Sequence, residues 1–195
     1  MNFNHFVTVA SLESKVSKDY GKYFGSAMMV GFGVVAFYRW QQTQLVFFLL
    51  LVLRDFAAGY FFLKRNPAQS KGPKLLTVLA YLSSAMPLLY LDSTVSSKTL
   101  FLSSDLLAIV GFLIVVLATV ELGTSIGISP ANRGLVRSGI YRYIKHPMYL
   151  GYVVSEIGLV ILNPLNAALF VLSLSLYIFR AKSENQILQP SKQSS

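Results

Sequence analysis

The chain has 195 residues, of which 54% are hydrophobic and only 13% are charged, with a formal net charge of +9 and no cysteine. This composition is too apolar for an ordinary soluble domain. The lack of cysteine excludes disulfides, thiolate nucleophiles and cysteine-based metal sites. Long uncharged stretches alternate with short charged ones, which predicts an all-α, polytopic integral membrane protein.

Residues 1–22 come first and are polar, with isolated apolar positions. Phe6, Val9, Leu12 and Val16 recur at helical spacing. This pattern is typical of a short helix that lies in the membrane interface. We therefore expect a cytoplasmic N-terminal segment with an interfacial helix.

Apolar segments then follow one another along the chain, which predicts about five to six apolar helices. The first four make up a transmembrane region at 23–122. A loop with proline and glycine at Arg65–Lys74 and a polar loop at Asp92–Asp105 separate them on opposite sides. The segments are Tyr23–Tyr38, Leu45–Leu63, Leu75–Leu91, Leu106–Leu122, Met148–Leu162 and Leu165–Phe179.

The positive charge is distributed unevenly between the two sides of this arrangement. If the N-terminus is cytoplasmic, the cytoplasmic parts hold a large excess of Lys and Arg. The opposite loops are balanced, with Arg39 and Lys98 against Asp92 and Asp105. This asymmetry is the positive-inside signal, so we expect both termini in the cytoplasm. It accounts for the net charge without a nucleic-acid partner.

The second half, 123–188, has a different pattern. The stretch Gly123–Lys145 is too polar to span a membrane and longer than most connections in compact domains. Two short apolar segments come next, separated only by Asn163 and Pro164, which predicts an antiparallel helical hairpin. The second helix can continue to Leu188, and the polar tail 189–195 is predicted to be disordered.

The hairpin predicts which polar residues meet. His146 lies about as far before the turn as Arg180 and Glu184 lie after it, and antiparallel helices place such residues at the same height. Arg180 and Glu184 also share one helix face. We expect the three at the cytoplasmic mouth of the hairpin. The alternative is ordinary topology, with interfacial tyrosines and a surface ion pair.

Ionisable residues also fall inside the apolar segments. Glu156 lies about ten residues into its segment, on the face of Tyr149 and Tyr152, and an ionisable group at that depth is by default a functional hypothesis. The alternative is a protonated side chain bonded to a neighbouring helix. Arg54 and Asp55 are expected to offset one another or to face the bundle interior, in a structural role.

Two motifs in the second half resemble the isoprenylcysteine carboxyl methyltransferase family and the wider membrane methyltransferases, including phospholipid N-methyltransferases. "KHPMYLG" at Lys145–Gly151 is similar to the family's basic-His-Pro-x-Tyr-x-Gly run. "RAKSENQIL" at Arg180–Leu188 is similar to its Arg-x-x-x-Glu-Glu-x-x-Leu helix, with Asn185 in place of the second glutamate. The family's aromatic extension after that helix is missing.

The resemblance implies S-adenosylmethionine as methyl donor and a lipid-like or prenylated acceptor that enters from the bilayer. It implies that Arg180 orients an anionic acceptor or the donor carboxylate. Glu184 would hold a donor hydroxyl or amine, or fix Arg180. The pair Arg180 and Glu184 is the expected catalytic set, and no metal is expected. The expected donor-binding residues are His146, Tyr149, Gly151, Tyr141, Glu184 and Asn185.

The acceptor stays open at this stage. A prenylated thiol carboxylate is the first hypothesis, because it needs a cation such as Arg180. A phospholipid amine is the second, because it needs a carboxylate or aromatic face such as Glu156 with Tyr152. A non-catalytic membrane scaffold that keeps the methyltransferase fold is the alternative, and Asn185 and the short tail favour it. A membrane reductase is a third reading, since sterol reductases have a related C-terminal hairpin. The sequence does not determine the oligomeric state.

Overall fold

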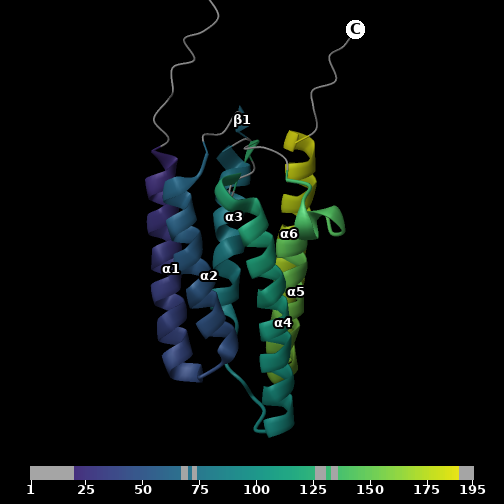
Figure 1. Cartoon of the computed structure of the whole chain (residues 1–195). Helices are drawn as coiled ribbons and strands as arrows, with labels where there is room; N and C mark the ends of the chain where they lie inside the picture. Colours follow the sequence, from purple (N-terminus) through teal and green to yellow (C-terminus); the bar gives the residue numbers. More distant parts are fainter. Residues whose placement is uncertain (1–19, 67–69, 72–73, 126–130, 133–135, 189–195) are drawn as a thin grey trace, which may run out of the picture.

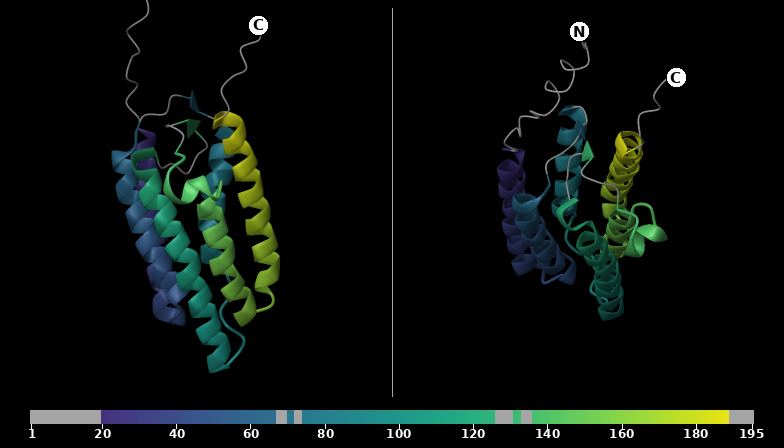
Figure 2. Two further views of the ribbon diagram at one scale, coloured as in Figure 1. Left: turned by 45° about the vertical axis from the view of Figure 1, so that its right-hand side comes forward. Right: turned by 45° about the horizontal axis from the view of Figure 1, so that its top comes forward.

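A computed structural model describes residues 20–66, 70–71, 74–125, 131–132 and 136–188 of the chain. The predicted interfacial helix and the predicted disordered tail lie outside these residues. Within the described residues, six α-helices run roughly parallel to one axis (Figures 1 and 2). They are α1 Gly21–Thr43, α2 Val46–Lys64, α3 Lys74–Ala85, α4 Lys98–Leu122, α5 Pro147–Leu162 and α6 Asn166–Leu188.

Short elements complete the described chain. Three 3₁₀ turns and two strands of two residues each occupy the connections between helices. They are η2 Met86–Leu89, η3 Gly123–Ser125, η4 Gly139–Arg142, β1 Ser70–Lys71 and β2 Ala131–Asn132. The two strands pair antiparallel and join the α2–α3 connection to the α4–α5 connection.

Helix α1 ends at Thr43, five residues beyond the predicted Tyr38, and two further helix boundaries differ more from the prediction. The segment expected at Leu75–Leu91 is helical only to Ala85 and then tightens into η2, which contains Pro87. A proline lacks the backbone N–H that an α-helix interior needs. The prediction that Asp92–Asp105 is a loop is wrong from Lys98 onward, where α4 begins. The carboxylate of Asp105 in α4 accepts a hydrogen bond from the backbone N–H of Val46, at 3.3 Å.

The helices pack as neighbouring pairs. α1 lies against α2, α4 lies against α5, and α3 contacts α6. The start of α1 and the end of α6 lie at the same end of the bundle, where β1 also lies (Figure 1). The main hydrophobic core joins α1, α2, η2, α4, α5 and α6. The prediction that both termini are cytoplasmic stays a prediction, because the fold gives their common end and no side of a membrane.

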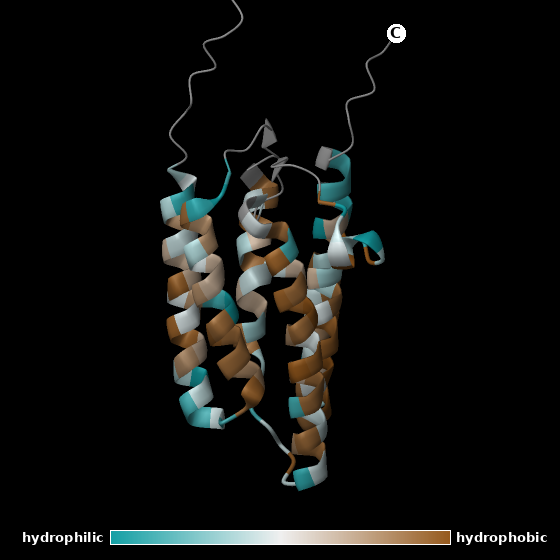
Figure 3. Cartoon of the chain, in the orientation of Figure 1, coloured by the Kyte–Doolittle hydropathy of each residue, from teal (hydrophilic) through white to brown (hydrophobic). Residues whose placement is uncertain are grey.

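The outer faces of the helices are apolar. Figure 3 shows hydrophobic residues along the middle of the helices and hydrophilic residues mainly near their ends. Large apolar side chains such as Leu106, Leu113 and Val120 of α4 are exposed. Two of the described helices, α2 and α4, are long and apolar enough to cross a membrane by length and composition, and α5 is a shorter apolar helix. Exposed apolar surface of this extent marks a membrane or protein contact.

The contact between α4 and α5 depends on glycine. A Cβ atom added to Gly151 would lie 2.5 Å from the backbone oxygen of Gly111, and one added to Gly111 would lie 2.4 Å from the backbone oxygen of Gly151. Small residues let helix backbones approach closely in this way. Gly151, expected among the donor-binding residues, thus has a packing reason to be glycine.

The predicted hairpin is present, with its turn at Asn163–Leu165 between α5 and α6. The side-chain amide of Asn163 donates to the backbone oxygen of Asp92 at 2.8 Å. Asn166 donates to the backbone oxygen of Leu91 at 3.1 Å and accepts from its N–H at 2.7 Å. The turn therefore fixes the connection between η2 and α4. The open end of the hairpin, where α5 begins and α6 ends, lies opposite the turn and contains the candidate site.

Candidate functional site

The open end of the hairpin brings His146 and Glu184 together, as the distance from the turn predicts. His146 caps the start of α5, and Glu184 lies near the end of α6. His146 Nδ1 lies 3.6 Å from Glu184 Oε2. Pro147 occupies the first position of α5, where the missing N–H is not needed. Both side chains stay partly accessible, so the pair can meet a water-soluble ligand.

Tyr149 and Asn185 complete this pair. The Tyr149 hydroxyl donates a hydrogen bond to Glu184 Oε1. Asn185 Oδ1 lies 3.2 Å from His146 Nε2. The imidazole therefore has a polar neighbour at each nitrogen, Glu184 on one side and Asn185 on the other. The amide of Asn185 thus makes a polar contact with the imidazole of the first motif.

Arg180 lies one turn of α6 deeper than Glu184 and is buried. Its Nη1 donates to the Ser83 hydroxyl of α3 at 2.7 Å, and its guanidinium lies over the Tyr149 ring at 5.1 Å from the centroid. It thus joins the predicted group through Tyr149. We call His146, Tyr149, Arg180, Glu184 and Asn185 the mouth cluster.

Three tyrosines extend from the mouth cluster into the bundle. The His146 and Tyr149 rings stack with centroids 5.7 Å apart, and the Tyr149 and Tyr177 rings stack at 5.6 Å and 11°. The Tyr152 ring follows at 5.7 Å from Tyr177. The sequence reasoning missed Tyr177. Its spacing of three residues before Arg180 and seven before Glu184 places it on their helix face and could have identified it.

Tyr141, also expected at the donor site, lies on η4 and is half-buried. Burial raises the pKa of its phenol, and the nearby Glu184 carboxylate raises that pKa further. The phenol is therefore neutral at physiological pH and can donate a hydrogen bond.

The 3₁₀ turn η4 that carries Tyr141 requires glycine at its start. Gly139 has φ at +50°, and an added Cβ would collide with the Glu121 carboxylate.

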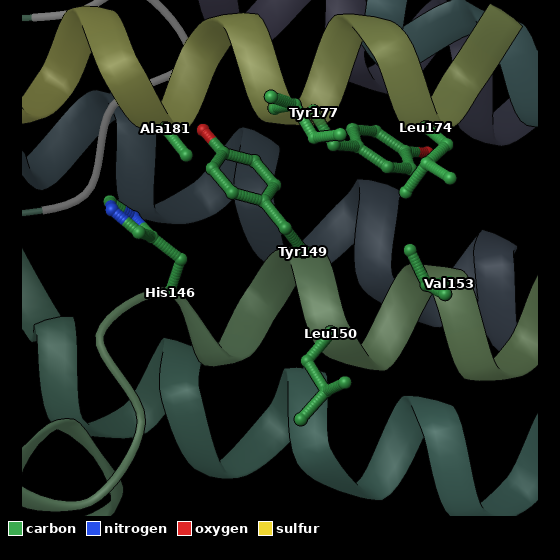
Figure 4. Close-up of a pocket in the computed structure, with 8 residues that line it drawn as sticks. His146, Tyr149, Leu150, Val153, Leu174, Tyr177 and Ala181 are labelled. Atoms are coloured by element: carbon green, nitrogen blue, oxygen red, sulfur yellow. The ribbon is translucent and has the colours of Figure 1, made fainter.

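A groove of about 270 Å³ lies between α5 and α6, beginning at the mouth cluster (Figure 4). In Figure 4 the His146 and Tyr149 rings stand at one end, and Val153 and Leu174 lie farther along the hairpin. Apart from the polar tips of its aromatic residues, the lining is apolar. The lining residues are His146, Tyr149, Leu150, Val153, Leu174, Tyr177, Ile178 and Ala181.

A second group of polar residues lies deeper in the bundle. Glu156 Oε1 accepts from the Tyr177 hydroxyl at 2.7 Å, and Oε2 accepts from the Tyr90 hydroxyl at 2.9 Å. Arg54 and Asp55 of α2 form an ion pair at 2.9 Å, as the sequence predicts. The Arg54 guanidinium lies 5.3 Å from the centroid of the Tyr152 ring. The interior cluster consists of Arg54, Asp55, Tyr90, Tyr152, Glu156 and Tyr177.

The predicted alternatives for Glu156 can now be compared with the structure. Its carboxyl group bonds to a neighbouring helix through Tyr177 of α6, as the structural alternative states. Its protonation state stays a prediction. No group of three His, Cys, Asp or Glu side chains suited to a metal ion occurs within the described ranges.

Comparison with known proteins identifies the region that builds the mouth cluster. No curated protein and no solved structure matches the chain. Residues 106–190 match the isoprenylcysteine carboxyl methyltransferase family. The match includes α5, α6 and both motifs, and it supports a membrane methyltransferase of the isoprenylcysteine type. Residues 106–190 therefore carry the isoprenylcysteine carboxyl methyltransferase family pattern, as the paired motifs predicted.

Proposed function

We propose that this protein is a membrane-embedded methyltransferase that uses S-adenosylmethionine and methylates an amphiphilic acceptor. The observation that carries the proposal is the convergence of the two family motifs in one cluster. His146 and Tyr149 come from the first motif, and both contact Glu184 of the second. Neither motif alone builds a site, because each supplies one side of it.

The mouth cluster has the chemistry to hold the donor. The Glu184 carboxylate can accept hydrogen bonds from the hydroxyl or amine groups of S-adenosylmethionine. The ring of Tyr149 stacks on both His146 and Tyr177, so these three side chains form an aromatic wall beside the carboxylate. When bound, this donor supplies an electrophilic methyl group to a nucleophilic oxygen or nitrogen. Tyr141 and Asn185 are the further proposed donor-binding residues, and Gly151 supports the start of α5 through its contact with α4.

The surroundings of the cluster suit an acceptor that arrives from a lipid bilayer. The groove between α5 and α6 begins at His146 and Tyr149 and continues along apolar side chains, including the exposed Leu150 and Ile178. We propose that the apolar chain of the acceptor lies in this groove. The apolar outer faces of the helices then contact lipid, and the mouth cluster faces the cytoplasm together with both termini.

A carboxylate acceptor simplifies the chemistry required of the protein. A carboxyl group is already ionised at pH 7, so no general base is needed to activate it. What remains is positioning and exclusion of water. The rings of Tyr149 and Tyr177 stack on one another beside the mouth. The buried guanidinium of Arg180 lies over one of these rings and supplies a cation close to the mouth. We therefore keep the prenylated carboxylate as the first acceptor and a phospholipid amine as the second.

The test is methyl transfer by the purified protein in nanodiscs that contain phosphatidylethanolamine. The donor carries a tritiated methyl group, and N-acetyl-S-farnesylcysteine is the added acceptor. A methyl ester releases tritiated methanol in base, whereas a methylated amine keeps its label. We expect base-labile product that depends on the farnesylcysteine and is lost in Glu184→Ala.

The other outcomes separate the alternatives. Base-stable label in the phospholipid would show that the acceptor group is an amine and not a carboxylate. A folded protein that binds S-adenosylhomocysteine but labels neither acceptor would favour the scaffold alternative. A folded protein that neither binds it nor transfers methyl groups would contradict the proposed function.

A further inference from the structure

Arg54 is a buried cation outside the region that matches the family. It lies on α2, and its side chain is only 9% exposed. Its neighbour Asp55 is fully buried. A buried charge is retained at a considerable free-energy penalty unless its donors are satisfied. The arrangement of the guanidinium donors therefore indicates what this residue does.

One edge of the Arg54 guanidinium faces Asp55 and the other does not. Nε lies 2.9 Å from Asp55 Oδ1, at the distance of an ion pair. On the other edge, Nη1 makes only a long hydrogen bond of 3.4 Å to the Tyr152 hydroxyl. Nη2 is buried and has no hydrogen-bond partner among the residues that the structure describes. Asp55 thus offsets the charge, and of the two terminal nitrogens Nη2 stays without a partner among the described residues.

The terminal end of the guanidinium faces the tyrosines that connect to the mouth cluster. Arg54 contacts Tyr152 of α5 through both the hydroxyl and the ring face. The Tyr152 ring is next to Tyr177, which stacks on Tyr149. Arg180 lies over the Tyr149 ring and Arg54 over the Tyr152 ring, so the two arginines contact the same row of tyrosines. Arg54 therefore belongs to the interior face of the proposed catalytic region.

Glu156, the second buried carboxylate of the interior cluster, has no oxygen without a hydrogen bond. Each oxygen of Glu156 already accepts a hydrogen bond from a tyrosine hydroxyl, Tyr177 for one and Tyr90 for the other. A ligand amine would have to displace one of them to reach the carboxylate directly. Both oxygens of Glu156 are therefore occupied, whereas Asp55, whose oxygens make no hydrogen bond among the described residues, is already ion-paired with Arg54. The buried donor that remains open at the terminal end of Arg54 is Nη2, and it suits an oxygen of a negatively charged ligand group.

We propose that Arg54 binds the carboxylate of the acceptor and so selects an anionic substrate, an inference that rests on the proposed methyltransferase function. The two terminal nitrogens of a guanidinium match the two oxygens of a carboxylate, and such bidentate pairs are among the strongest polar contacts in proteins. Asp55 provides the counter-charge beside the Nε edge of the guanidinium. Selection of the acceptor thereby falls to a helix of the N-terminal half.

The test measures binding of two matched probes to the protein in nanodiscs. One probe is N-acetyl-S-farnesylcysteine, and the other is its carboxamide, which has the same apolar chain and no charge. Arg54→Gln alone would leave Asp55 buried without its partner, so the main variant is Arg54→Gln with Asp55→Asn, which removes both charges together. Arg54→Lys keeps the charge and loses the guanidinium. Affinity for S-adenosylhomocysteine is measured on every variant as an independent readout of the donor site.

We expect the wild type to prefer the carboxylate by about tenfold or more, as hydrogen bonds to charged groups imply. The double variant should bind both probes equally, with unchanged affinity for S-adenosylhomocysteine, and Arg54→Lys should keep part of the preference. A folded double variant that keeps the full preference would overturn the proposal, and so would a wild type with no preference. A wild type that does not bind S-adenosylhomocysteine would instead contradict the proposed function. This outcome is distinct from failure of the Arg54 proposal, because the preference between the two probes is measured separately.

Discussion

The mouth cluster and the interior cluster both contain a carboxylate that accepts hydrogen bonds from tyrosine hydroxyls, yet they differ in access to solvent. The Glu184 side chain is 25% exposed, whereas Glu156 is 1% exposed as a residue. Glu184 accepts from one tyrosine and lies beside an accessible imidazole. Glu156 has a tyrosine on each oxygen. The first carboxylate can receive a ligand, and the second mainly joins helices.

The comparison shows that a carboxylate bonded to tyrosine hydroxyls is not by itself a ligand-binding site, because its exposure to solvent also matters. A buried polar network in which every group is paired rigidifies the fold, whereas a network with an unpaired donor or acceptor can bind a ligand. Within the interior cluster the two cases occur side by side, because both oxygens of Glu156 are paired while Nη2 of Arg54 has no partner among the described residues. Tyr177 belongs to the interior cluster and stacks on Tyr149, so it joins the two regions.

The largest expected effect is on stability, at the interior carboxylate. Glu156→Ala leaves the buried hydroxyls of Tyr90 and Tyr177 without an acceptor, and we expect it to destabilise the protein by about 2–4 kcal/mol. Thermal unfolding in detergent, followed by circular dichroism, measures this. Glu156→Gln keeps one acceptor oxygen and is the matched control, with a smaller loss expected. Equal unfolding temperatures for wild type and Glu156→Ala would show that the interior cluster contributes nothing to stability.

A smaller loss is expected where α4 and α5 meet. Gly151→Ala would place a methyl group 2.5 Å from the backbone oxygen of Gly111, and overpacking of this kind costs about 1–3 kcal/mol. The same unfolding measurement tests it. Gly31→Ala on α1 is the control, because nothing lies within 4 Å of its added Cβ. We expect Gly31→Ala to be neutral or slightly stabilising, since alanine favours helix over glycine. Matching losses in the two variants would refute the packing role of Gly151.

The smallest effect is expected within the mouth cluster, at the position that departs from the family. Asn185→Ala removes the contact to His146 Nε2 and should weaken S-adenosylhomocysteine binding by about 1 kcal/mol, which is about fivefold. Unfolding should change little, because this side chain is partly exposed. Calorimetric titration of the two proteins gives the comparison. A loss as large as that of Glu184→Ala would mean that Asn185 holds the donor directly.

The sequence predicted much of the second half and little of how the first half meets it. The Asn163–Pro164 turn sets the height of every residue on two antiparallel helices, so the approach of His146 to Glu184 followed from counting. Ser83 and Tyr90 gave no such signal, since their contacts to Arg180 and Glu156 depend on how the connection after α3 packs across the bundle. The pairing of Arg54 with Asp55 was predicted, whereas the contact of Arg54 with Tyr152 depends on how the distant helix α5 packs against α2.

The measurement that tests the central claim most directly is calorimetric titration of S-adenosylhomocysteine into nanodisc-embedded wild type, Glu184→Ala and Glu156→Gln. If the mouth cluster holds the donor, the wild type binds saturably and Glu184→Ala binds at least about tenfold more weakly, as loss of hydrogen bonds to a charged group implies. Glu156→Gln then binds within about twofold of the wild type, because its contacts lie in the interior cluster. The account is contradicted if folded wild type does not bind, or if Glu156→Gln loses as much affinity as Glu184→Ala.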